Sequence, residues 1–360
     1  MADGTGGPLR LAVVGAGDVA WRDYLPHMAG PGGRLGDLGR VEMVVAGDAV
    51  RAEAAARAFG VPRHAAGWEA ALDPGVDAVV NLTPGPLHGA VNLAVAASGR
   101  HLYSEKPLAL DLPTARAVAE AARASGGRLA SAPSVMVFPQ VRAAAGVLAR
   151  GGIGAVRAAR ALATVPPPPW EGFVGDYGPY FGEGIGAVVD IGVYAIHALA
   201  GLLGEVAEVA ALSTRSRQGF EAPGGWVEVR SDDTWQAVLR LRSGVPASLL
   251  VSFAAEAAPA FVLEIMGERG TLAVSLIDPA VPLVVRGGGG ERVVEVAHER
   301  LDGPDHVLGV RELLRAVREG REPVIGAGPA LHGLAVIAAL RGSAREGRFV
   351  AVEATGWTGL

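Results

Sequence analysis

Three polar side chains interrupt an otherwise apolar stretch of the sequence between Ala187 and Leu199. Asp190, Tyr194 and His197 are spaced so that a regular helix would place all three on one face. Burying three polar groups is costly, so we expect this stripe to line a site at which protons are transferred. The alternative is that they are core residues whose hydrogen bonds are satisfied within the protein.

A second set of polar residues follows the apolar strands that we expect in the first third of the chain. Asp77–Leu82 and His101–Ser104 have the composition of buried strands. Ligands of parallel sheets bind beyond the carboxyl ends of the strands, so the residues that come next are candidate site residues. They are Thr83, Pro84, His88, Glu105 and Lys106. The alternatives are that Lys106 is a solvated surface charge and that His88 merely begins a helix.

The strand expected at Leu9–Val14 ends in a Gly-x-Gly-x-x-Ala motif, Gly15-Ala16-Gly17-Asp18-Val19-Ala20. Gly15 permits a tight turn, Gly17 lets a pyrophosphate approach the backbone, and Ala20 lets helix and strand pack closely. Free N–H groups at the start of the helix, near Val19, would face the phosphates. Many such motifs are ordinary strand–turn–helix corners, but the apolar strand before this one favours a dinucleotide site.

Asp48 follows the second expected strand, Val41–Ala46, and precedes a helix that Arg51 opens. A carboxylate at this place can bind both ribose hydroxyls of NAD and repels the 2′-phosphate of NADP. Asp48 can also cap the helix that follows. Arg51 could receive a 2′-phosphate, so the sequence favours NAD and leaves NADP open.

The order of the expected elements indicates two domains. Strands and helices alternate up to residue 133, including the helix Leu112–Ser125 and the strand Leu129–Ala132, which is typical of a doubly wound parallel Rossmann sheet. From residue 134 to 360, strands that follow one another without helices favour antiparallel pairing. These strands are expected at Val156–Thr164, Val206–Thr214, Asp233–Arg242, Val245–Ala254, Phe261–Gly267, Thr271–Leu276, Val281–Arg286 and Arg292–Ala297.

We therefore expect a dinucleotide-binding α/β Rossmann domain over residues 1–133. An α+β domain with a large, mostly antiparallel sheet follows over residues 134–360. Closing helices at Asp305–Glu319 and Pro329–Arg345 could pack back on the first domain. The proline-rich stretch Val165–Trp170 leads into an aromatic loop from Phe173 to Phe181, which is either a platform for a sugar ring or a loop stapled to the core.

Composition narrows the class of protein. The formal net charge of −5 argues against a nucleic-acid or membrane-surface partner. The absence of Cys excludes disulfides, thiolate metal sites and a Cys nucleophile, and the scattered His residues argue against metal catalysis. No apolar run has transmembrane length, and no apolar signal core precedes the first strand, so we expect a cytoplasmic protein.

Several sequence blocks, in order and spacing, resemble the Gfo/Idh/MocA family of NAD(P)-dependent oxidoreductases, which includes glucose–fructose oxidoreductase and inositol dehydrogenase. The blocks are Gly15-x-Gly17, Thr83-Pro84 with His88, Glu105-Lys106-Pro107, Phe138-Pro139 and Gly152-x-Gly154. The resemblance covers nearly the whole chain. It implies a cis bond before Pro107. It also implies that the domain over residues 134–360 binds the substrate and forms homo-oligomers, either dimers or tetramers, through the open face of its sheet.

The apolar helix stretch is similar to the family motif Asp-x-Gly-x-His-x-x-Asp, with two departures. Asp190 and Gly192 match, Tyr194 stands where many members have His, and His197 stands where Asp is common. The proton donor therefore stays open between Tyr194 and His197. A further departure is the apolar run Ser134–Phe138, where members often carry Asn or Arg.

We interpret the sequence as that of an NAD(P)-dependent dehydrogenase or reductase acting on the CH–OH group of a sugar, a polyol or a related cyclic substrate. Lys106 would polarise the substrate oxygen, and Tyr194 would carry the proton, made more acidic by the ammonium. Asp190 or His197 would relay the proton or bind hydroxyls. Two other classes stay open: a glycosidase or lyase that uses NAD for transient oxidation, and a non-catalytic dinucleotide-binding regulator.

Overall fold

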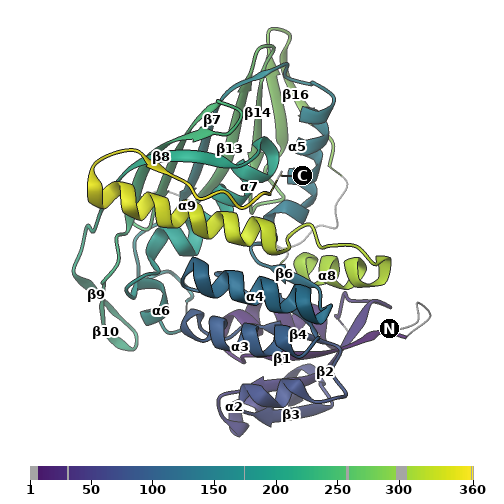
Figure 1. Cartoon of the computed structure of the whole chain (residues 1–360). Helices are drawn as coiled ribbons and strands as arrows, with labels where there is room; N and C mark the ends of the chain where they lie inside the picture. Colours follow the sequence, from purple (N-terminus) through teal and green to yellow (C-terminus); the bar gives the residue numbers. More distant parts are fainter. Residues whose placement is uncertain are drawn as a thin grey trace. The chain divides into compact units, whose positions relative to one another are not determined.

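The computed structural model describes residues 7–30, 32–173, 175–256, 259–296, 306–357 and 359 (Figure 1). These residues divide into two compact units. The first contains the described residues up to 134 and those from 306 to 330. The second contains the described residues between 135 and 296 and those from 331 onward.

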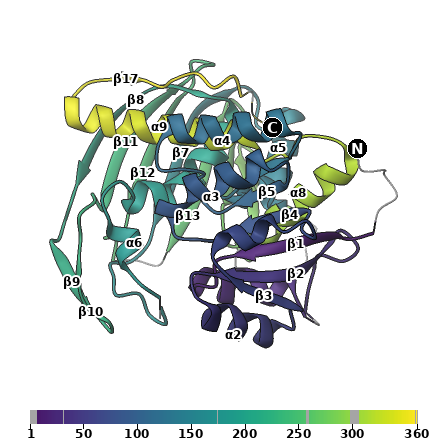
Figure 2. The ribbon, with the colours of Figure 1, turned by 60° about the horizontal axis from the view of Figure 1, so that its bottom comes forward.

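The first unit is built on a parallel six-stranded sheet in the order β3-β2-β1-β4-β5-β6. The strands are β1 (Leu9–Val14), β2 (Gly39–Ala46), β3 (Arg63–Ala66), β4 (Ala78–Asn81), β5 (His101–Ser104) and β6 (Leu129–Ser131). Figure 2 shows β1, β2 and β3 side by side, with α2 (Ala49–Phe59) packed on β2 and β3. The strand order reverses between β1 and β4, which is the place where open parallel sheets bind their ligands.

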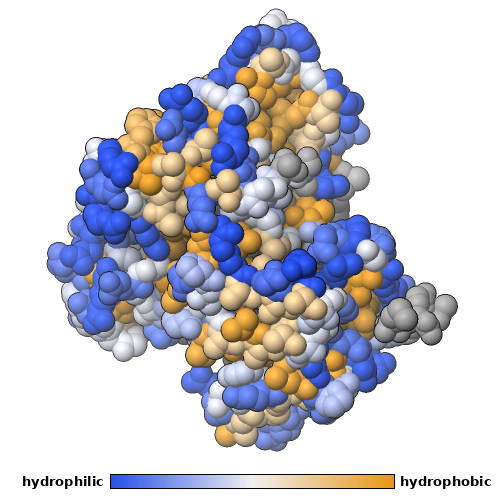
Figure 3. Space-filling view, in the orientation of Figure 1, coloured by the Kyte–Doolittle hydropathy of each residue, from blue (hydrophilic) through white to orange (hydrophobic). Residues whose placement is uncertain are grey.

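The helices of the first unit begin and end where the sequence provides caps. Asp48 caps α2 and Asp111 caps α4 (Leu112–Ser125), and the left-handed glycines Gly60 and Gly126 end the same two helices. α3 (Gly85–Ala97) packs beside α4, and the surface over the pair mixes polar and apolar side chains (Figure 3). The remaining helices are η1 (Ala20–Tyr24), α1 (Leu25–Met28), η2 (Trp68–Leu72) and α8 (Val307–Glu319), which packs on β5 and β6.

The second unit is built on a nine-stranded sheet in the order β16-β15-β14-β13-β7-β12-β11-β8-β17. The strands are β7 (Val156–Thr164), β8 (Val206–Thr214), β11 (Thr234–Leu241), β12 (Pro246–Ser252), β13 (Ala260–Gly267), β14 (Thr271–Ser275), β15 (Leu283–Gly287), β16 (Gly290–Val294) and β17 (Val350–Ala351). All neighbouring pairs are antiparallel except β7 and β12. The mostly antiparallel sheet is therefore confirmed, with one parallel pair that the sequence did not indicate.

The second unit also contains helices. They are α5 (Pro139–Ala149), α6 (Gly178–Phe181), η4 (Val188–Gly192), α7 (Val193–Leu203) and α9 (Ala327–Glu346), which begins in the first unit. A short η3 (Ser134–Val137) precedes α5. α7 lies against β7 and β13 and is buried along most of its length, which matches its almost wholly apolar sequence.

The sequence missed three short elements: β3, the hairpin of β9 (Gly219–Ala222) with β10 (Gly225–Glu228), and β17. Their side chains are largely exposed or half-buried, so they lack the apolar run or alternation that marks a strand. Two expected bounds, Ala297 and Asp305, lie outside the described residues.

Candidate active site

The turn after β1 has the form that a dinucleotide requires. Gly15 has φ +107°, and a Cβ at this position would lie 2.5 Å from the Leu82 carbonyl oxygen, so the fold itself demands glycine. The Gly15 N–H donates to the Val45 carbonyl at 2.8 Å. A Cβ at Gly17, by contrast, would meet nothing within 4 Å. Gly17 therefore leaves open space beside the main chain, as the close approach of a pyrophosphate needs.

The helix after this turn is short and begins with a π-helical turn, η1. Asp18 points to the Arg22 guanidinium at 2.5 Å, and Arg22 also pairs with Asp23 at 2.8 Å. The negative charge of Asp18, next to the expected phosphates, is thus compensated by a cation one turn later. The expected helix start near Val19 agrees with the structure.

Asp48 is the N-cap of α2, which confirms one of its two predicted roles. Its Oδ1 accepts the Arg51 N–H at 2.9 Å, and its Oδ2 lies 3.4 Å from the Arg51 Nε. Both side chains are exposed, so Oδ2 can exchange Arg51 for another partner at little cost. The predicted ribose contact remains a prediction.

A buried amide and hydroxyl network joins the loops that follow β4 and β5. Asn81 Oδ1 accepts the Thr83 N–H at 3.1 Å and the Thr83 hydroxyl at 2.7 Å. Asn81 Nδ2 donates to Asn92 Oδ1 at 2.8 Å, and Asn92 Nδ2 donates to Ser104 Oγ and the Leu108 carbonyl, each at 2.8 Å. The sequence reasoning missed Asn81 and Asn92, although their polar side chains in apolar segments were a usable signal.

His88 lies inside this edge of the first unit. Its Nδ1 is 2.6 Å from the Pro107 carbonyl oxygen, and its Nε2 is 2.7 Å from the Thr83 carbonyl oxygen. Burial lowers the pKa of His88, although the two carbonyls and the Glu105 charge act in the opposite direction. The ring therefore ties the two loops together. This differs from the expected cofactor contact, because both ring nitrogens already face main-chain oxygens.

Glu105 is also turned into the protein. Its Oε1 accepts the Tyr24 hydroxyl at 2.6 Å, and its Oε2 accepts the Lys106 N–H at 2.9 Å. Both carboxylate oxygens thus have donors from the first unit. Like His88, Glu105 fixes the loop from within, and the predicted cofactor contact of its side chain is not what the structure shows.

Lys106 is half-buried and follows directly after these anchors. The Lys106–Pro107 bond is cis, as the family resemblance implies. Lys106 is the single lysine of the chain, whose other basic side chains at neutral pH are all arginines. Lys and Arg differ in that an ammonium is a compact point charge that can give up its proton. A chain that uses Arg everywhere else keeps Lys here.

The predicted stripe of Asp190, Tyr194 and His197 lies in the second unit. Asp190 lies in the π-helical turn η4, whereas Tyr194 and His197 lie in the regular helix α7. The three residues therefore lie on one continuous helical segment, and the predicted stripe remains a prediction. Tyr194 is 9% exposed, and its ring meets the edge of Phe261 at a centroid distance of 5.9 Å.

His197 is enclosed, which corrects the expectation that it faces a substrate. It is 2% exposed, and a Cβ on Gly333 would come within 2.5 Å of its Nε2. Its Nδ1 has no hydrogen-bond partner among the described residues. Burial and the neighbouring His332 lower the pKa of His197 to about 3, so the ring is neutral at physiological pH. A neutral, enclosed imidazole cannot deliver a proton to an outside group.

His332 belongs to a second buried cluster beside His197. Its Nε2 accepts the Val206 N–H at 3.1 Å, and its Nδ1 lies 3.7 Å from Glu205 Oε1. Burial lowers the pKa of His332 to about 4, against the opposing effect of Glu205. Although burial raises the pKa of Glu205, hydrogen bonds from Thr355, Arg242 and the main chain bring it to about 2.

The aromatic loop after the proline-rich stretch is stapled to the core of the second unit. The Trp170 ring contacts Phe173, Tyr177, Tyr180, Phe181 and Phe253. The Tyr177 hydroxyl accepts the Trp170 N–H at 2.9 Å, and the Trp170 Nε1 donates to the Pro166 carbonyl at 2.9 Å. The rings thus use one another as packing partners, which is the second of the two predicted roles.

Within the part of the chain that the structure describes, no group of three or more His, Cys, Asp or Glu side chains could hold a metal ion. Within the same residues, no helix is both long and apolar enough to cross a membrane.

A parallel sheet in the order 3-2-1-4-5-6, with a glycine turn after its first strand, defines a dinucleotide-binding Rossmann fold. Residues 9–132 match the family model described as oxidoreductase family, NAD-binding Rossmann fold, and residues 141–273 match the GFO/IDH/MocA C-terminal domain. The chain belongs to the Gfo/Idh/MocA family of oxidoreductases, and residues 9–132 are its NAD-binding domain.

Relatives with curated functions extend this result. The dTDP-3,4-didehydro-2,6-dideoxy-α-D-glucose 3-reductase of Actinomadura kijaniata is 30% identical over 348 residues, covering 94% of this chain and 96% of that protein. The trans-1,2-dihydrobenzene-1,2-diol dehydrogenase of Mus musculus is 27% identical, covering 75% of this chain and 73% of that protein. The structure of a levoglucosan dehydrogenase in complex with NADH and levoglucosan has a TM-score of 0.86 at 21% identity and covers 96% of this chain and 99% of its own.

Proposed function

We propose that this enzyme moves a hydride between the nicotinamide C4 of NAD and the CH–OH or C=O carbon of a sugar, polyol or related cyclic substrate. Bound NAD supplies or accepts the hydride, and the protein supplies geometry and charge. Lys106 carries the proposal: it is the single lysine of the chain, and it stands at the carboxyl end of β5 on an internally anchored loop.

Lys106 is the electrostatic group of the proposed reaction. Its ammonium donates to the substrate oxygen and stabilises the alkoxide charge that this oxygen carries before the hydride leaves or gains as the hydride arrives. Glu105 and His88 hold the main chain on either side and reduce the freedom of the loop. A charge that is already in place acts on the transition state without reorganisation.

Tyr194 is the proposed proton carrier. Tyr194 stands on α7 and is 9% exposed, whereas His197 is 2% exposed and its ring is neutral. A phenol near an ammonium becomes more acidic and can exchange a proton with the substrate oxygen. Asp190, half-buried in the turn before α7, is the proposed partner for substrate hydroxyls.

NAD is the proposed cofactor in preference to NADP. The Asp48 carboxylate lies at the end of β2, where its Oδ2 can turn to the adenosine ribose hydroxyls. The same charge repels a 2′-phosphate. Titrations with NADH and NADPH, followed by tryptophan fluorescence, test this preference. Trp21, one turn beyond Gly17, lies near the expected cofactor site. Equal or tighter binding of NADPH would transfer the role to Arg51.

The names of the relatives support the proposed substrate class. The names include a dTDP-deoxyglucose reductase, a trans-dihydrodiol dehydrogenase, a scyllo-inositol 2-dehydrogenase from Bacillus subtilis and a 1,5-anhydro-D-fructose reductase from Ensifer adhaerens. Each name points to a ring that carries a hydroxyl or carbonyl at the reacting carbon. We infer the same chemical class for this enzyme.

A panel read at 340 nm tests the proposed function. The panel contains inositols, aldoses, anhydrosugars and cyclic diols with NAD, and the matching ketones with NADH. Net change in NADH with at least one compound is the expected result. Hydrolysis of a glycoside without net NADH would identify a glycosidase or lyase, and tight NADH binding without any turnover would identify a regulator.

Self-association through the second sheet is the proposed assembly. Leu212 on β8 and Val238 on β11 are 73% and 51% exposed on the face away from α7. Ion pairs of Arg160 with Glu264 and of Arg240 with Glu208 border them. A second copy would cover this apolar strip and meet both signs of charge. Sedimentation should show a dimer or tetramer, and V238E should yield monomers if the face is the interface.

A further inference from the structure

The main chain around Lys106 is held on both sides by groups inside the first unit. The Glu105 N–H donates to the Asn81 carbonyl at 2.8 Å, and the Glu105 carboxylate accepts the Lys106 N–H at 2.9 Å. The Pro107 carbonyl on the other side is 2.6 Å from His88 Nδ1. The place of Lys106 therefore depends on where the Glu105 carboxylate is held.

Tyr24 holds that carboxylate. The Tyr24 hydroxyl donates to Glu105 Oε1 at 2.6 Å, and the Tyr24 side chain is fully buried. The ring stacks on His306 at a centroid distance of 5.9 Å and packs against Tyr103 at 6.0 Å. Burial, with the Glu105 charge next in effect, raises the pKa of Tyr24 well above 10, so the phenol keeps its proton at neutral pH.

The hydroxyl chain behind Tyr24 shows which proton reaches Glu105. Ser134 donates to the His306 carbonyl at 3.2 Å, so the Tyr103 proton goes either to Ser134 Oγ or to the Tyr24 oxygen, each at 3.0 Å. An ionised carboxylate can only accept, so the Tyr24 proton is the one that bonds Glu105. The Tyr103 hydroxyl lies 3.0 Å from the hydroxyls of both Tyr24 and Ser134, and Tyr103 supplies a matched control.

We propose that Tyr24 is a positioning residue for Lys106. Its hydroxyl fixes the Glu105 carboxylate, the carboxylate fixes the Lys106 main chain, and the main chain sets the direction from which the ammonium reaches the substrate oxygen. Tyr24 ends η1, the segment that begins just after the glycine turn, so the element next to the dinucleotide also sets the lysine. The proposal rests on the proposed function for Lys106.

The single lysine makes a direct test possible without a substrate. Reductive methylation with ¹³C-formaldehyde labels only Lys106 and the terminal amine and keeps their charge. The terminal amine is recognised by its pKa of about 8. The chemical shift of the Lys106 signal at neutral pH then reports the surroundings of its ammonium. E105Q should shift this signal, which shows that it senses the Glu105 anchor.

Tyr24→Phe removes one oxygen and leaves the ring in place. Loss of the hydrogen bond that holds the Glu105 carboxylate should shift the Lys106 signal in the same direction as E105Q. Tyr103→Phe removes an oxygen from the same chain and should leave the Lys106 signal at its wild-type position.

A kinetic comparison follows with a substrate from the panel. Tyr24→Phe should lower kcat about tenfold, while the Kd of NADH stays within about twofold, because the hydroxyl acts on Lys106 alone. Tyr103→Phe should leave kcat within about twofold at a similar loss of thermal stability.

Equal effects of the two variants on the Lys106 signal, or no effect of Tyr24→Phe, would overturn the positioning role. Failure of the whole panel would overturn the proposed function alone, because the Lys106 signal still decides the role of Tyr24.

Discussion

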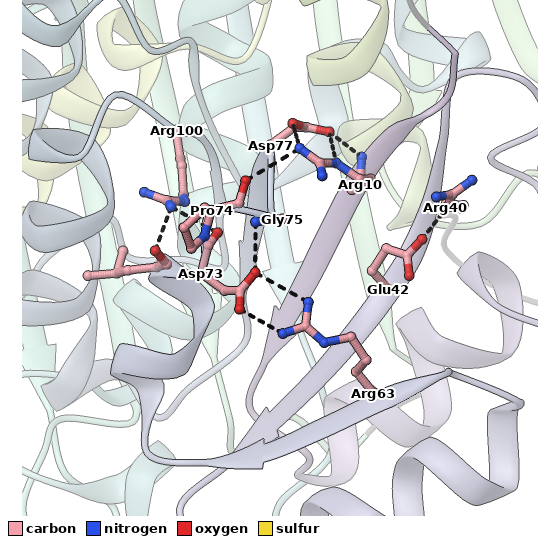
Figure 4. A network of polar contacts seen from close by, with 10 residues as sticks. Arg10, Arg40, Glu42, Arg63, Asp73, Pro74, Gly75, Asp77 and Arg100 are labelled. Carbon is pink, nitrogen blue, oxygen red and sulfur yellow. Dashed lines mark hydrogen bonds and ion pairs between the residues drawn. The ribbon is translucent and has the colours of Figure 1, made fainter.

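The two edges of the Rossmann sheet are built from different kinds of polar group. At the amino edge, charged pairs connect the beginnings of the strands (Figure 4). Arg10 makes a two-bonded pair with Asp77 at 2.8 and 3.0 Å, and Arg63 makes one with Asp73 at 2.7 and 3.3 Å. At the carboxyl edge, buried amide and hydroxyl side chains join the loops instead of charged pairs.

This difference separates stability from function. The two ion pairs at the amino edge are half-exposed, and both partners of each pair belong to the protein. Their charges therefore neutralise one another within the fold. The carboxyl edge places its polar groups in internal hydrogen bonds and leaves open space beside Gly17. Substitutions at one edge should therefore change stability alone, and substitutions at the other should change binding or turnover.

The largest predicted effect concerns α7. Here we assign Tyr194 to turnover and His197 to stability, as we do for the carboxyl and amino edges of the Rossmann sheet. Tyr194→Phe should lower kcat by roughly 10²–10⁴-fold, the usual contribution of a positioned acid or base, with little loss of stability. His197→Asn should instead lower the free energy of unfolding and leave kcat within a few-fold. Steady-state kinetics with thermal melts measure both. A large kcat loss only in His197→Asn would reverse the assignment.

Acid should weaken the second unit through its enclosed histidines. Their folded pKa values of about 3 for His197 and about 4 for His332 lie below the unfolded value of about 6.5. The unfolded chain therefore binds more protons, and stability falls as the pH drops from about 6.5 toward 4, by up to about 1.4 kcal/mol per unit for each ring. Glu205 adds its effect only below about pH 4.5, where its unfolded form takes up a proton.

Chemical unfolding at stepped pH measures this slope. His332→Gln keeps a side chain that can accept the Val206 N–H but has no titration, so it should flatten the slope between pH 6.5 and 4. An unchanged slope would mean that His332 is protonated in the folded protein.

The glycine turn offers a pair that separates the two effects within one edge. Gly15→Ala should cost about 2 kcal/mol or more of stability, because both its positive φ and the Leu82 carbonyl oppose a Cβ. Gly17→Ala should leave the fold intact and weaken NADH binding about tenfold or more, because its Cβ takes only the open space. Wild-type NADH affinity in a stable Gly17→Ala would remove the pyrophosphate from this turn.

The smallest predicted effect lies at the amino edge. Asp77→Asn removes the charge opposite Arg10, which holds the pKa of Asp77 below its usual value. It should lower the free energy of unfolding by about 1 kcal/mol and leave NADH binding unchanged. Denaturant titration and NADH fluorescence check the two halves. A change in NADH affinity would break the comparison between the edges.

The sequence predicts the sheets well because apolar runs and turns are local signals. β5, β7, β8 and α4 begin and end at the predicted residues. The surroundings of the site residues depend on distant partners. Tyr24 meets Glu105 across 81 positions, and His88 meets Pro107 across 19, so no local pattern shows that these groups face inward. His197 was misjudged because its neighbours His332 and Gly333 come from α9.

The π-helical turn η4 is a second feature that periodicity could not show. The turn includes Asp190 and ends before Tyr194, so the angle between their side chains depends on a feature that spacing alone does not show. The family resemblance selected the candidate site residues, and the contacts of His88 and Glu105 show anchoring roles that no local pattern indicates.

Lys106→Ala tests the central claim most directly, with Asp77→Asn as the control from the opposite edge. With the best substrate of the panel, the account predicts that Lys106→Ala lowers kcat by about 10²–10³-fold or more. The Kd of NADH should stay within about threefold, because the ammonium acts on the substrate oxygen. Turnover by Lys106→Ala within a few-fold of wild type would contradict the account.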